Sequence, residues 1–122
     1  MVANKLAYRF GAPHAGDLAV LESPRDEGVL VKRIVALGGQ VVEIRDGVLF
    51  VDGRRRNEPY VDHLRVDGFF FGPERVPRGA VFVLGDDRAA SDDSRDFGAI
   101  PRSGLIGRVD LRIRPPGELF PL

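Results

Sequence analysis

The sequence contains no cysteine, no tryptophan and no threonine. Without cysteine there is no disulfide scaffold, no thiolate metal site and no cysteine nucleophile. Long hydrophobic runs are also missing, and none approaches the roughly 20 apolar residues that a transmembrane helix needs. The 122 residues are enough for one domain with a modest core.

An excess of charge of one sign is missing as well. Eighteen basic residues balance eighteen acidic ones. Domains that bind nucleic acid usually carry a basic excess, so this balance argues against a nucleic-acid partner. The sequence has only two lysines, Lys5 and Lys32. Its four serines are Ser23, Ser91, Ser94 and Ser103. Candidate bases and hydroxyl nucleophiles are therefore few.

Short strands dominate the predicted secondary structure. Fifteen glycines and nine prolines interrupt the chain, and no segment keeps a 3.6-residue apolar period, so helices should be short or absent. Asp46-Gly47 predicts a two-residue hairpin turn, and Asp52-Gly53 turns the chain again. The predicted strands are residues 18–21, 29–37, 41–45, 48–51, 80–84 and 105–113. The fold class is therefore mainly β, a barrel or sandwich of short strands.

Two irregular segments interrupt this pattern. Residues 54–79 contain three consecutive arginines and three prolines, which predicts a β-rich excursion inserted between strands. Residues 85–103 read GDDRAASDDSRDFGAIPRS and are polar, acidic and bounded by glycine, which predicts a long structured loop. Loops longer than ~12–15 residues in compact domains tend to be functional or disordered.

The predicted strand 29–37 carries a cation on each face, because side chains alternate along a strand. One face would hold Leu30, Lys32, Ile34 and Ala36, and the other Val29, Val31, Arg33 and Val35. Both faces are otherwise apolar, so at least one cation lies beside the core. A lysine in apolar surroundings gives up its proton more readily, and a neutral amine is a competent general base for a serine hydroxyl. Alternatively, Lys32 reaches solvent from an edge strand while its stem covers apolar surface.

The segment 85–98 places five aspartates, two arginines and two serines between two glycines. One interpretation is a loop fixed by charge-assisted hydrogen bonds from Arg88 and Arg95 to its carboxylates, which would hold a serine hydroxyl beside Lys32. A Ca²⁺ site is a second interpretation. The spacing of the aspartates departs from the EF-hand pattern, and the two arginines would repel a cation. We therefore expect no metal in this segment. A third interpretation is a solvated acidic loop without function, against which the flanking glycines argue.

A series of segments, in order along nearly the whole chain, resembles type I signal peptidase. They are NKLAYRF, VKRIVALGG, EIRDGVLFVDG, EPY, FGPERVPRGAVFVLGDDRAASDDSRDFGAIP and GLIGRV. The most specific is VLGDDRAASDDSRDFG, combined with the lysine strand upstream. The resemblance implies that residues 1–122 form a mostly β catalytic domain, with 54–79 as an insertion. It implies a serine endopeptidase without cofactor that removes signal peptides from exported preproteins, outside the cytoplasmic membrane.

The resemblance also implies roles for residues in this sequence. Lys32 matches the general base, and Ser91 matches the serine whose hydroxyl orients the lysine amine. Asp93 and Arg95 match an ion pair that keeps the loop near the site. Structural support of the site is accordingly expected from Asp86, Arg88, Asp93, Ser94 and Arg95.

The implied substrate is a preprotein signal peptide bound as an extended strand, with Val29 and Val31 among the residues that contact it. The family is also associated with an apolar surface that touches lipid, so Phe69, Phe70 and Phe71 are candidates for membrane contact. Alternatively, the three rings pack onto the β core beneath the excursion. Three consecutive residues cannot all face inward from a strand, so at least one should be exposed.

Two departures from the family lie beside the expected site. The family usually has Leu-Pro-Gly-Asp where this chain has Leu37-Gly38-Gly39-Gln40, and Gly-Asp-Asn-Arg where it has Gly85-Asp86-Asp87-Arg88. These changes bear on the rigidity of a turn and the charge of a loop. They do not touch Lys32 or Ser91.

A third departure concerns the nucleophile. The family's nucleophilic serine lies in a Ser-Met-x-Pro motif upstream of the strand that NKLAYRF resembles, and the sequence begins after that point. We therefore expect this chain to carry the base without the nucleophile, as part of a longer protein, and to be inactive by itself. The alternatives are a hydrolase that uses Ser91 or Ser94 with Lys32, and a non-catalytic peptide-binding module.

Overall fold

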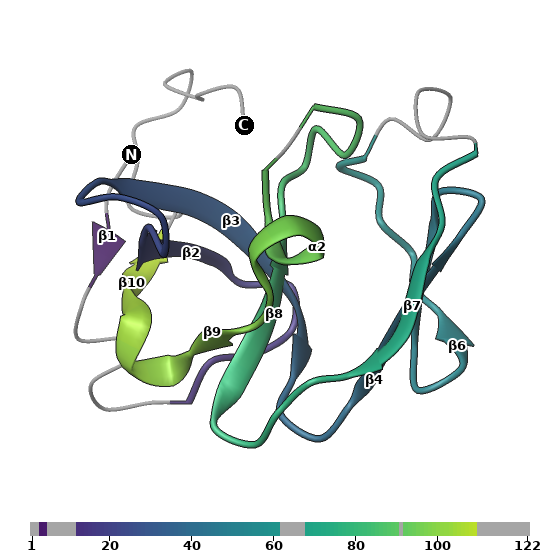
Figure 1. Ribbon diagram of the computed structural model, residues 1–122, viewed down its shortest axis with the longest axis horizontal. Helices are drawn as coiled ribbons and strands as arrows, with labels where there is room; N and C mark the ends of the chain where they lie inside the picture. Colours follow the sequence, from purple (N-terminus) through teal and green to yellow (C-terminus); the bar gives the residue numbers. More distant parts are fainter. Residues whose placement is uncertain (1–2, 5–11, 62–67, 91, 110–122) are drawn as a thin grey trace.

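The computed structural model describes residues 3–4, 12–61, 68–90 and 92–109. The strands within these ranges form two antiparallel sheets, which confirms the mainly β fold class (Figure 1). The six-stranded sheet has the order β1-β10-β2-β3-β8-β9, and the four-stranded sheet has the order β6-β5-β4-β7. In Figure 1 the four-stranded sheet lies on the right, and β8 lies near the centre of the molecule.

The first sheet contains β1 (Ala3–Asn4), β2 (Leu18–Glu22), β3 (Val29–Leu37), β8 (Ala80–Leu84), β9 (Ile100–Pro101) and β10 (Leu105–Val109). The second contains β4 (Val41–Arg45), β5 (Val48–Val51), β6 (Arg54–Arg55) and β7 (Phe71–Arg75). A single helical turn, α2 (Ser94–Phe97), and a 3-10 turn, η2 (Arg102–Gly104), complete the described elements. The expectation of short helices is therefore confirmed for the part of the chain that the structure covers.

The predicted strands and turns agree closely with the observed ones. The strands predicted at 29–37, 41–45, 48–51 and 80–84 have the predicted bounds. Asp46 and Gly47 have φ angles of 49° and 80°, and Asp52 and Gly53 have 52° and 78°. Positive φ at both central residues is the backbone of the two-residue hairpin turn that these dipeptides favour. The strand predicted at 105–113 is present as β10, and residues 110–113 lie outside the described ranges.

Residues 54–79 are β-rich as predicted, and they supply both outer strands of the second sheet. β6 pairs with β5 through Phe50 and Arg55, and β7 pairs with β4 through Val42 and Glu74. Residues 62–67 of this excursion lie outside the described ranges. The excursion is thus joined to the second sheet by backbone pairing at both of its ends.

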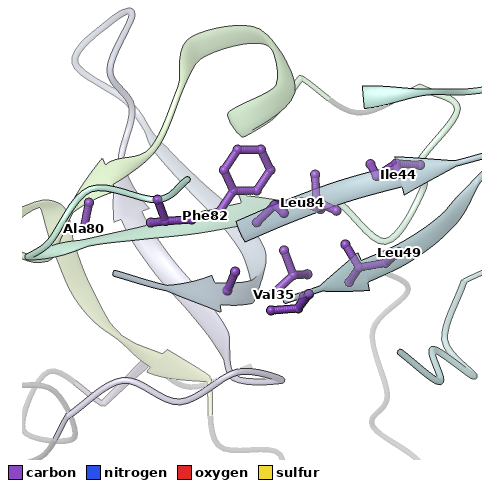
Figure 2. Close-up of a cluster of buried hydrophobic side chains, with 10 residues drawn as sticks. Val35, Ile44, Leu49, Ala80, Phe82 and Leu84 are labelled. Carbon is purple, nitrogen blue, oxygen red and sulfur yellow. The ribbon is translucent and has the colours of Figure 1, made fainter. Parts of the chain in front are cut away.

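One hydrophobic cluster lies between the two sheets. Figure 2 shows Val35, Phe82 and Leu84 from the first sheet facing Ile44 and Leu49 from the second. A second cluster covers the opposite face of the first sheet. It contains Ala19, Leu21, Ile34, Val81, Val83 and Ile100. Because β8 contributes to both clusters it is buried on both faces, which explains its uninterrupted apolar sequence.

The predicted facing of β3 is wrong at Ala36. The pairing of β3 with β8 shifts register between Ile34, opposite Val83, and Ala36, opposite Phe82. Such a bulge places two residues of one strand opposite one residue of the partner and breaks the alternation. Ala36 therefore packs with its neighbour Val35 in the cluster between the sheets, and does not share a face with Ile34.

Candidate active site

Lys32 lies on β3 in the interior of the six-stranded sheet, opposite Ala19 of β2. β8 pairs with β3 only from Arg33 onward, so at Lys32 the described strands pair with β3 on the β2 side alone. The residue is half-buried. Leu30 and Ile34, two positions away on either side, both belong to the second hydrophobic cluster. Side-chain alternation therefore directs Lys32 toward the apolar face of the sheet that is away from β4–β7.

The neighbouring cation, Arg33, attaches the start of the acidic loop to β3. Its Nε and Nη2 donate to the two carboxylate oxygens of Asp86 at 3.2 and 2.7 Å. Its Nη1 donates to the backbone oxygen of Gly16 at 3.1 Å. The guanidinium carbon lies 4.0 Å from the centre of the Tyr60 ring. Asp86 is therefore held beside the strand that carries Lys32 by a two-point, charge-assisted contact.

Arg88 is buried, and its partner lies outside the loop. Its Nη1 and Nη2 donate to the Oε1 and Oε2 atoms of Glu58 at 2.9 and 2.7 Å, and its Nε donates to the Gly85 oxygen at 2.7 Å. Arg88 is 4% exposed and Glu58 is 2% exposed. The prediction that a carboxylate of the loop would pair with Arg88 is therefore wrong. Both Nη atoms of Arg88 are bound by the two carboxylate oxygens of Glu58, and its Nε is bound by the Gly85 oxygen.

Asp93 and Arg95 form the predicted ion pair. Asp93 is fully buried, and its two oxygens accept from Nε and Nη2 of Arg95 at 2.9 and 2.8 Å. Asp93 also caps α2 and accepts from the Gly85 amide at 3.0 Å, while Arg95 donates to the Arg88 oxygen at 2.8 Å. Burial lowers the pKa of Arg95, but the hydrogen bond and charge of Asp93 outweigh it and raise the pKa overall. These contacts close the base of the loop.

The two serines of the loop differ in what the structure shows of them. Ser94 is buried, and its Oγ accepts a hydrogen bond of 2.9 Å from the amide of Val83 on β8. Ser91 lies outside the described residues. The structure therefore fixes the loop on both sides of Ser91, at Arg88 and at Asp93.

Val29 and Val31 lie in the half of β3 that precedes Lys32. β8 pairs with β3 only from Arg33 onward, opposite Leu84. Along Val29–Val31 the described strands pair with β3 on the β2 side alone. Val29 is exposed and Val31 is half-buried. Among the described strands, none pairs with this half-strand on the β8 side up to Lys32, and this side is called the open edge of β3.

The three consecutive phenylalanines divide between core and surface. Phe71 packs onto Phe82 with ring centres 5.3 Å apart, whereas Phe69 and Phe70 are 41% and 69% exposed. The prediction that at least one ring is exposed is confirmed. The three rings line one side of a cavity of about 330 Å³. The other lining residues are Ile44, Arg88, Ala89, Arg95 and Asp96.

Two features are absent from the parts of the chain that the structure describes. No helix there is long and apolar enough to cross a membrane. No group of three histidine, aspartate or glutamate side chains there could hold a metal ion. Of the five aspartates of the loop, Asp86 pairs with Arg33 and Asp93 pairs with Arg95.

Comparison with known proteins places the chain in a family. Residues 1–114 match the family described as signal peptidase, peptidase S26. The chain belongs to the signal peptidase family. Signal peptidase I V of Bacillus subtilis is 35% identical over 121 residues, covering 89% of this chain and 71% of that protein. The thylakoidal processing peptidase 1 of Arabidopsis thaliana is 35% identical, covering 98% of this chain and 38% of that protein.

The fold agrees with that assignment. The crystal structure of a signal peptidase I from Enterococcus faecalis V583 superposes with a TM-score of 0.71 at 32% sequence identity. The match covers 80% of this chain and 97% of that chain. A probable signal peptidase I-1 from Synechocystis is 36% identical, and this chain spans 62% of its length. The arrangement of two antiparallel sheets is thus the fold of a signal peptidase.

Sequence reasoning missed three residues that fix the site of this signal peptidase. Alternation places Arg33 on one face of its strand but does not say what it contacts. Glu58 and Tyr60 enter the sequence analysis only as part of the EPY segment. Their contacts join residues that lie 53 and 30 positions apart in the chain. The one available signal was the EPY segment, which places a charged residue and an aromatic residue on either side of a proline.

Proposed function

We propose that this chain provides the general base of a serine endopeptidase that removes signal peptides from exported preproteins. The observation that carries the proposal is the position of Lys32. It lies where β8 begins to pair with β3, on the face that carries the second hydrophobic cluster, and its neighbour Arg33 holds the loop that leads to Ser91. Membership of the signal peptidase family supplies the reaction class, since the chain matches it over residues 1–114.

In the proposed reaction the Lys32 amine takes the proton from a serine hydroxyl. The serine oxygen then bonds to the scissile carbonyl carbon, and Lys32 returns the proton to the leaving nitrogen as the carbon–nitrogen bond breaks. Lys32 next takes a proton from water, whose oxygen bonds to the acyl carbon. The ester carbon–oxygen bond then breaks, and Lys32 returns the proton to the serine oxygen. Ser91 orients the amine in both steps. The nucleophile is the serine of a Ser-Met-x-Pro segment, a motif that residues 1–122 do not contain.

The open edge of β3 is the proposed binding site for the signal peptide. An extended peptide placed along Val29–Val31 would form backbone hydrogen bonds with the side of β3 that no described strand pairs with. This edge ends at Lys32. The scissile bond of a peptide bound along it would therefore lie next to the Lys32 amine. Val31 contributes a small apolar wall, which suits small substrate side chains.

Phe69 and Phe70 are the proposed lipid contacts of the protein at the outer face of the cytoplasmic membrane. Both rings are exposed, and Phe71 anchors their segment to Phe82 in the core. Sedimentation with lipid vesicles tests this contact. The Phe69→Ser/Phe70→Ser variant should bind fewer vesicles than the unsubstituted protein, and equal binding would exclude the two rings as the contact.

The test of the catalytic role starts from the codons before Met1. The reading frame that contains this chain is expressed in full, and hydrolysis of a preprotein peptide is measured for the unsubstituted protein and for Lys32→Arg. Arginine has a long basic side chain like lysine, but it stays protonated and cannot act as a base near neutral pH. We expect kcat to fall by about a thousandfold or more, because general-base catalysis contributes typically 10²–10⁴-fold.

Two controls make the result specific. Lys5→Arg changes the only other lysine in the same way and should keep the activity. The chain of 122 residues alone should not hydrolyse the peptide. Full activity of Lys32→Arg would exclude Lys32 as the base. Hydrolysis by the isolated chain at the same kcat/KM would show that its nucleophile lies within these residues.

A further inference from the structure

Glu58 and Tyr60 have no role in the proposed function, yet both contact the residues that hold the catalytic loop. They flank Pro59 at the start of the excursion, just after β6. Glu58 is 2% exposed, although a charged side chain is rarely buried unless it is paired. This short segment therefore contacts two arginines, Arg88 through Glu58 and Arg33 through Tyr60.

The first contact fixes the loop through Arg88. Both carboxylate oxygens of Glu58 accept from Arg88, at 2.9 and 2.7 Å. The third donor of Arg88, its Nε, binds the Gly85 oxygen, and the Arg88 oxygen accepts from Arg95. Glu58 therefore sets the orientation of a guanidinium that links Gly85 to the base of the loop. Arg88 is three residues before Ser91.

The second contact fixes β3 through Arg33. The Tyr60 ring stacks at 4.0 Å from the Arg33 guanidinium, whose other side is bound to both oxygens of Asp86. The Tyr60 hydroxyl donates to Glu58 Oε2 at 3.5 Å, which connects the two contacts. Burial, followed by the charge of Glu58, raises the pKa of Tyr60, so this hydroxyl keeps its proton and remains a donor. Arg33 is adjacent to Lys32 in the chain.

We propose that Glu58 and Tyr60 are positioning residues that set the placement of the Ser91 loop relative to Lys32. The inference rests on the proposed function and extends it from the base to the residues that align it. Glu58 acts through Arg88 on the loop, and Tyr60 acts through Arg33 on Asp86 and β3. Neither residue touches the reacting atoms. Their effect should therefore appear in the geometry of the lysine amine and in kcat, with substrate binding at the β3 edge unchanged.

A link of this kind differs from a purely structural one in a measurable way. A structural ion pair changes the fraction of folded protein, whereas a positioning pair changes the site within the folded protein. Displacement of a catalytic group by about 1 Å can cost about 100-fold in rate. Glu58→Gln keeps the volume of the side chain but removes the charge and one acceptor oxygen. Tyr60→Ala removes the stacked ring at a partly exposed position and serves as the variant that folds if Glu58→Gln does not.

The kinetic test uses the protein expressed from its full reading frame. We expect Glu58→Gln and Tyr60→Ala to lower kcat by about tenfold or more and to leave KM within about twofold, the pattern of an interaction lost in the transition state. Tyr60→Phe keeps the ring over Arg33 and should retain more activity than Tyr60→Ala. Glu74→Gln, an exposed glutamate on β7, is the matched control. Unchanged kcat in both test variants would overturn the proposal.

The spectroscopic test does not depend on hydrolysis. The chain has only two lysines, so labelling with ¹³Cε-lysine gives one signal from Lys32 and one from Lys5, assigned with Lys32→Arg. Folded Glu58→Gln and Tyr60→Ala should move the Lys32 signal and leave the Lys5 signal in place, and Glu74→Gln should move neither. An unmoved Lys32 signal would overturn the proposal. A moved signal in the 122-residue chain, with no hydrolysis of preprotein peptides by the unsubstituted product of the full reading frame, would instead overturn the proposed function.

Discussion

The Ser94 hydroxyl is held by the backbone of β8. β9 pairs with β8 only at Ala80 and Val81, so the Val83 amide beyond the end of β9 needs another acceptor. Ser94 Oγ supplies it at 2.9 Å, and Asp93 does the same for the Gly85 amide at 3.0 Å. The first turn of α2 thus continues the edge that β9 leaves incomplete. A buried oxygen with this task argues against the alternative in which Ser94 attacks a peptide bond.

Replacement of Ser94 by alanine should therefore destabilise the fold. It leaves the buried Val83 amide without its acceptor, and such a group costs about 1–3 kcal/mol. Urea unfolding followed by circular dichroism measures the loss. Ser103→Ala, at an exposed residue of η2, should change stability by less than about 0.5 kcal/mol. Equal stability of the two variants would mean that the Val83 amide finds another partner.

Of the two expected pairings between an arginine and a carboxylate of the loop, the structure contains one, at Arg95, and not the other, at Arg88. The acidic loop and the family resemblance pointed to Arg88, Asp93 and Arg95, and all three are buried or half-buried there. The Asp93–Arg95 pair was expected from the family resemblance, and the structure contains it. The Arg88–Glu58 pair was not expected, because it exists only once the excursion returns to the loop. Alternation along a strand says which face a cation occupies but not which carboxylate reaches it.

Among the elements, β3 shows which structural features side-chain alternation predicts and which it does not. Its bounds and the opposite facing of Lys32 and Arg33 follow from alternation. The bulge after Ile34 does not, because it arises from pairing with β8 and leaves no signal in a run of aliphatic residues. The bulge lies beyond Lys32, so the predicted side of the lysine is unaffected. It places both Val35 and Ala36 against the second sheet.

The turn from β3 to β4 explains one departure from the family. A Cβ atom on Gly38 would lie 2.8 Å from the Pro77 oxygen and 3.1 Å from the Gly79 nitrogen, so a side chain does not fit there. Gln40 closes the turn instead. Its Oε1 accepts from the Leu37 amide at 2.8 Å, and its backbone amide donates to the Leu37 oxygen at 3.0 Å. Residues 77–79 approach the turn so closely that only glycine fits at position 38.

Introducing the family's residue should harm this element. Gly38→Pro and Gly38→Ala both place an atom against backbone that is joined to the turn by the Gly39–Val76 hydrogen bond. Forcing an extra group into a packed region costs about 1–3 kcal/mol. Thermal unfolding measures the loss. If Gly38→Pro were as stable as the unsubstituted chain, the 77–79 segment would have to move away without cost, and the contact would not explain the departure.

At the scale of the molecule, one strand joins the two halves of the fold. β8 packs Phe82 and Leu84 against the second sheet and Val81 and Val83 into the second cluster. The apolar run of β8 was readable from the sequence, but its place between two clusters was not, because a short apolar run has no period that assigns its faces. The Glu58–Arg88 contact crosses between the same two parts, from the excursion to the loop that follows β8. The geometry of the site thus depends on both sheets staying packed together.

This dependence predicts a single cooperative unfolding unit, which Phe82→Ala can test. Removal of a buried phenylalanine side chain costs about 3–5 kcal/mol. Because Phe82 contacts the cluster shared by both sheets, amide hydrogen exchange should accelerate equally in β2 of the first sheet and β5 of the second. Phe50→Ala is the control, since this half-buried ring outside both clusters stacks on Arg45 at 3.7 Å and should cost only about 1 kcal/mol. Faster exchange confined to β5 would show that the second sheet opens alone. Glu58 could then leave Arg88 while the first sheet stayed folded, and the catalytic loop would lose its outer support without global unfolding.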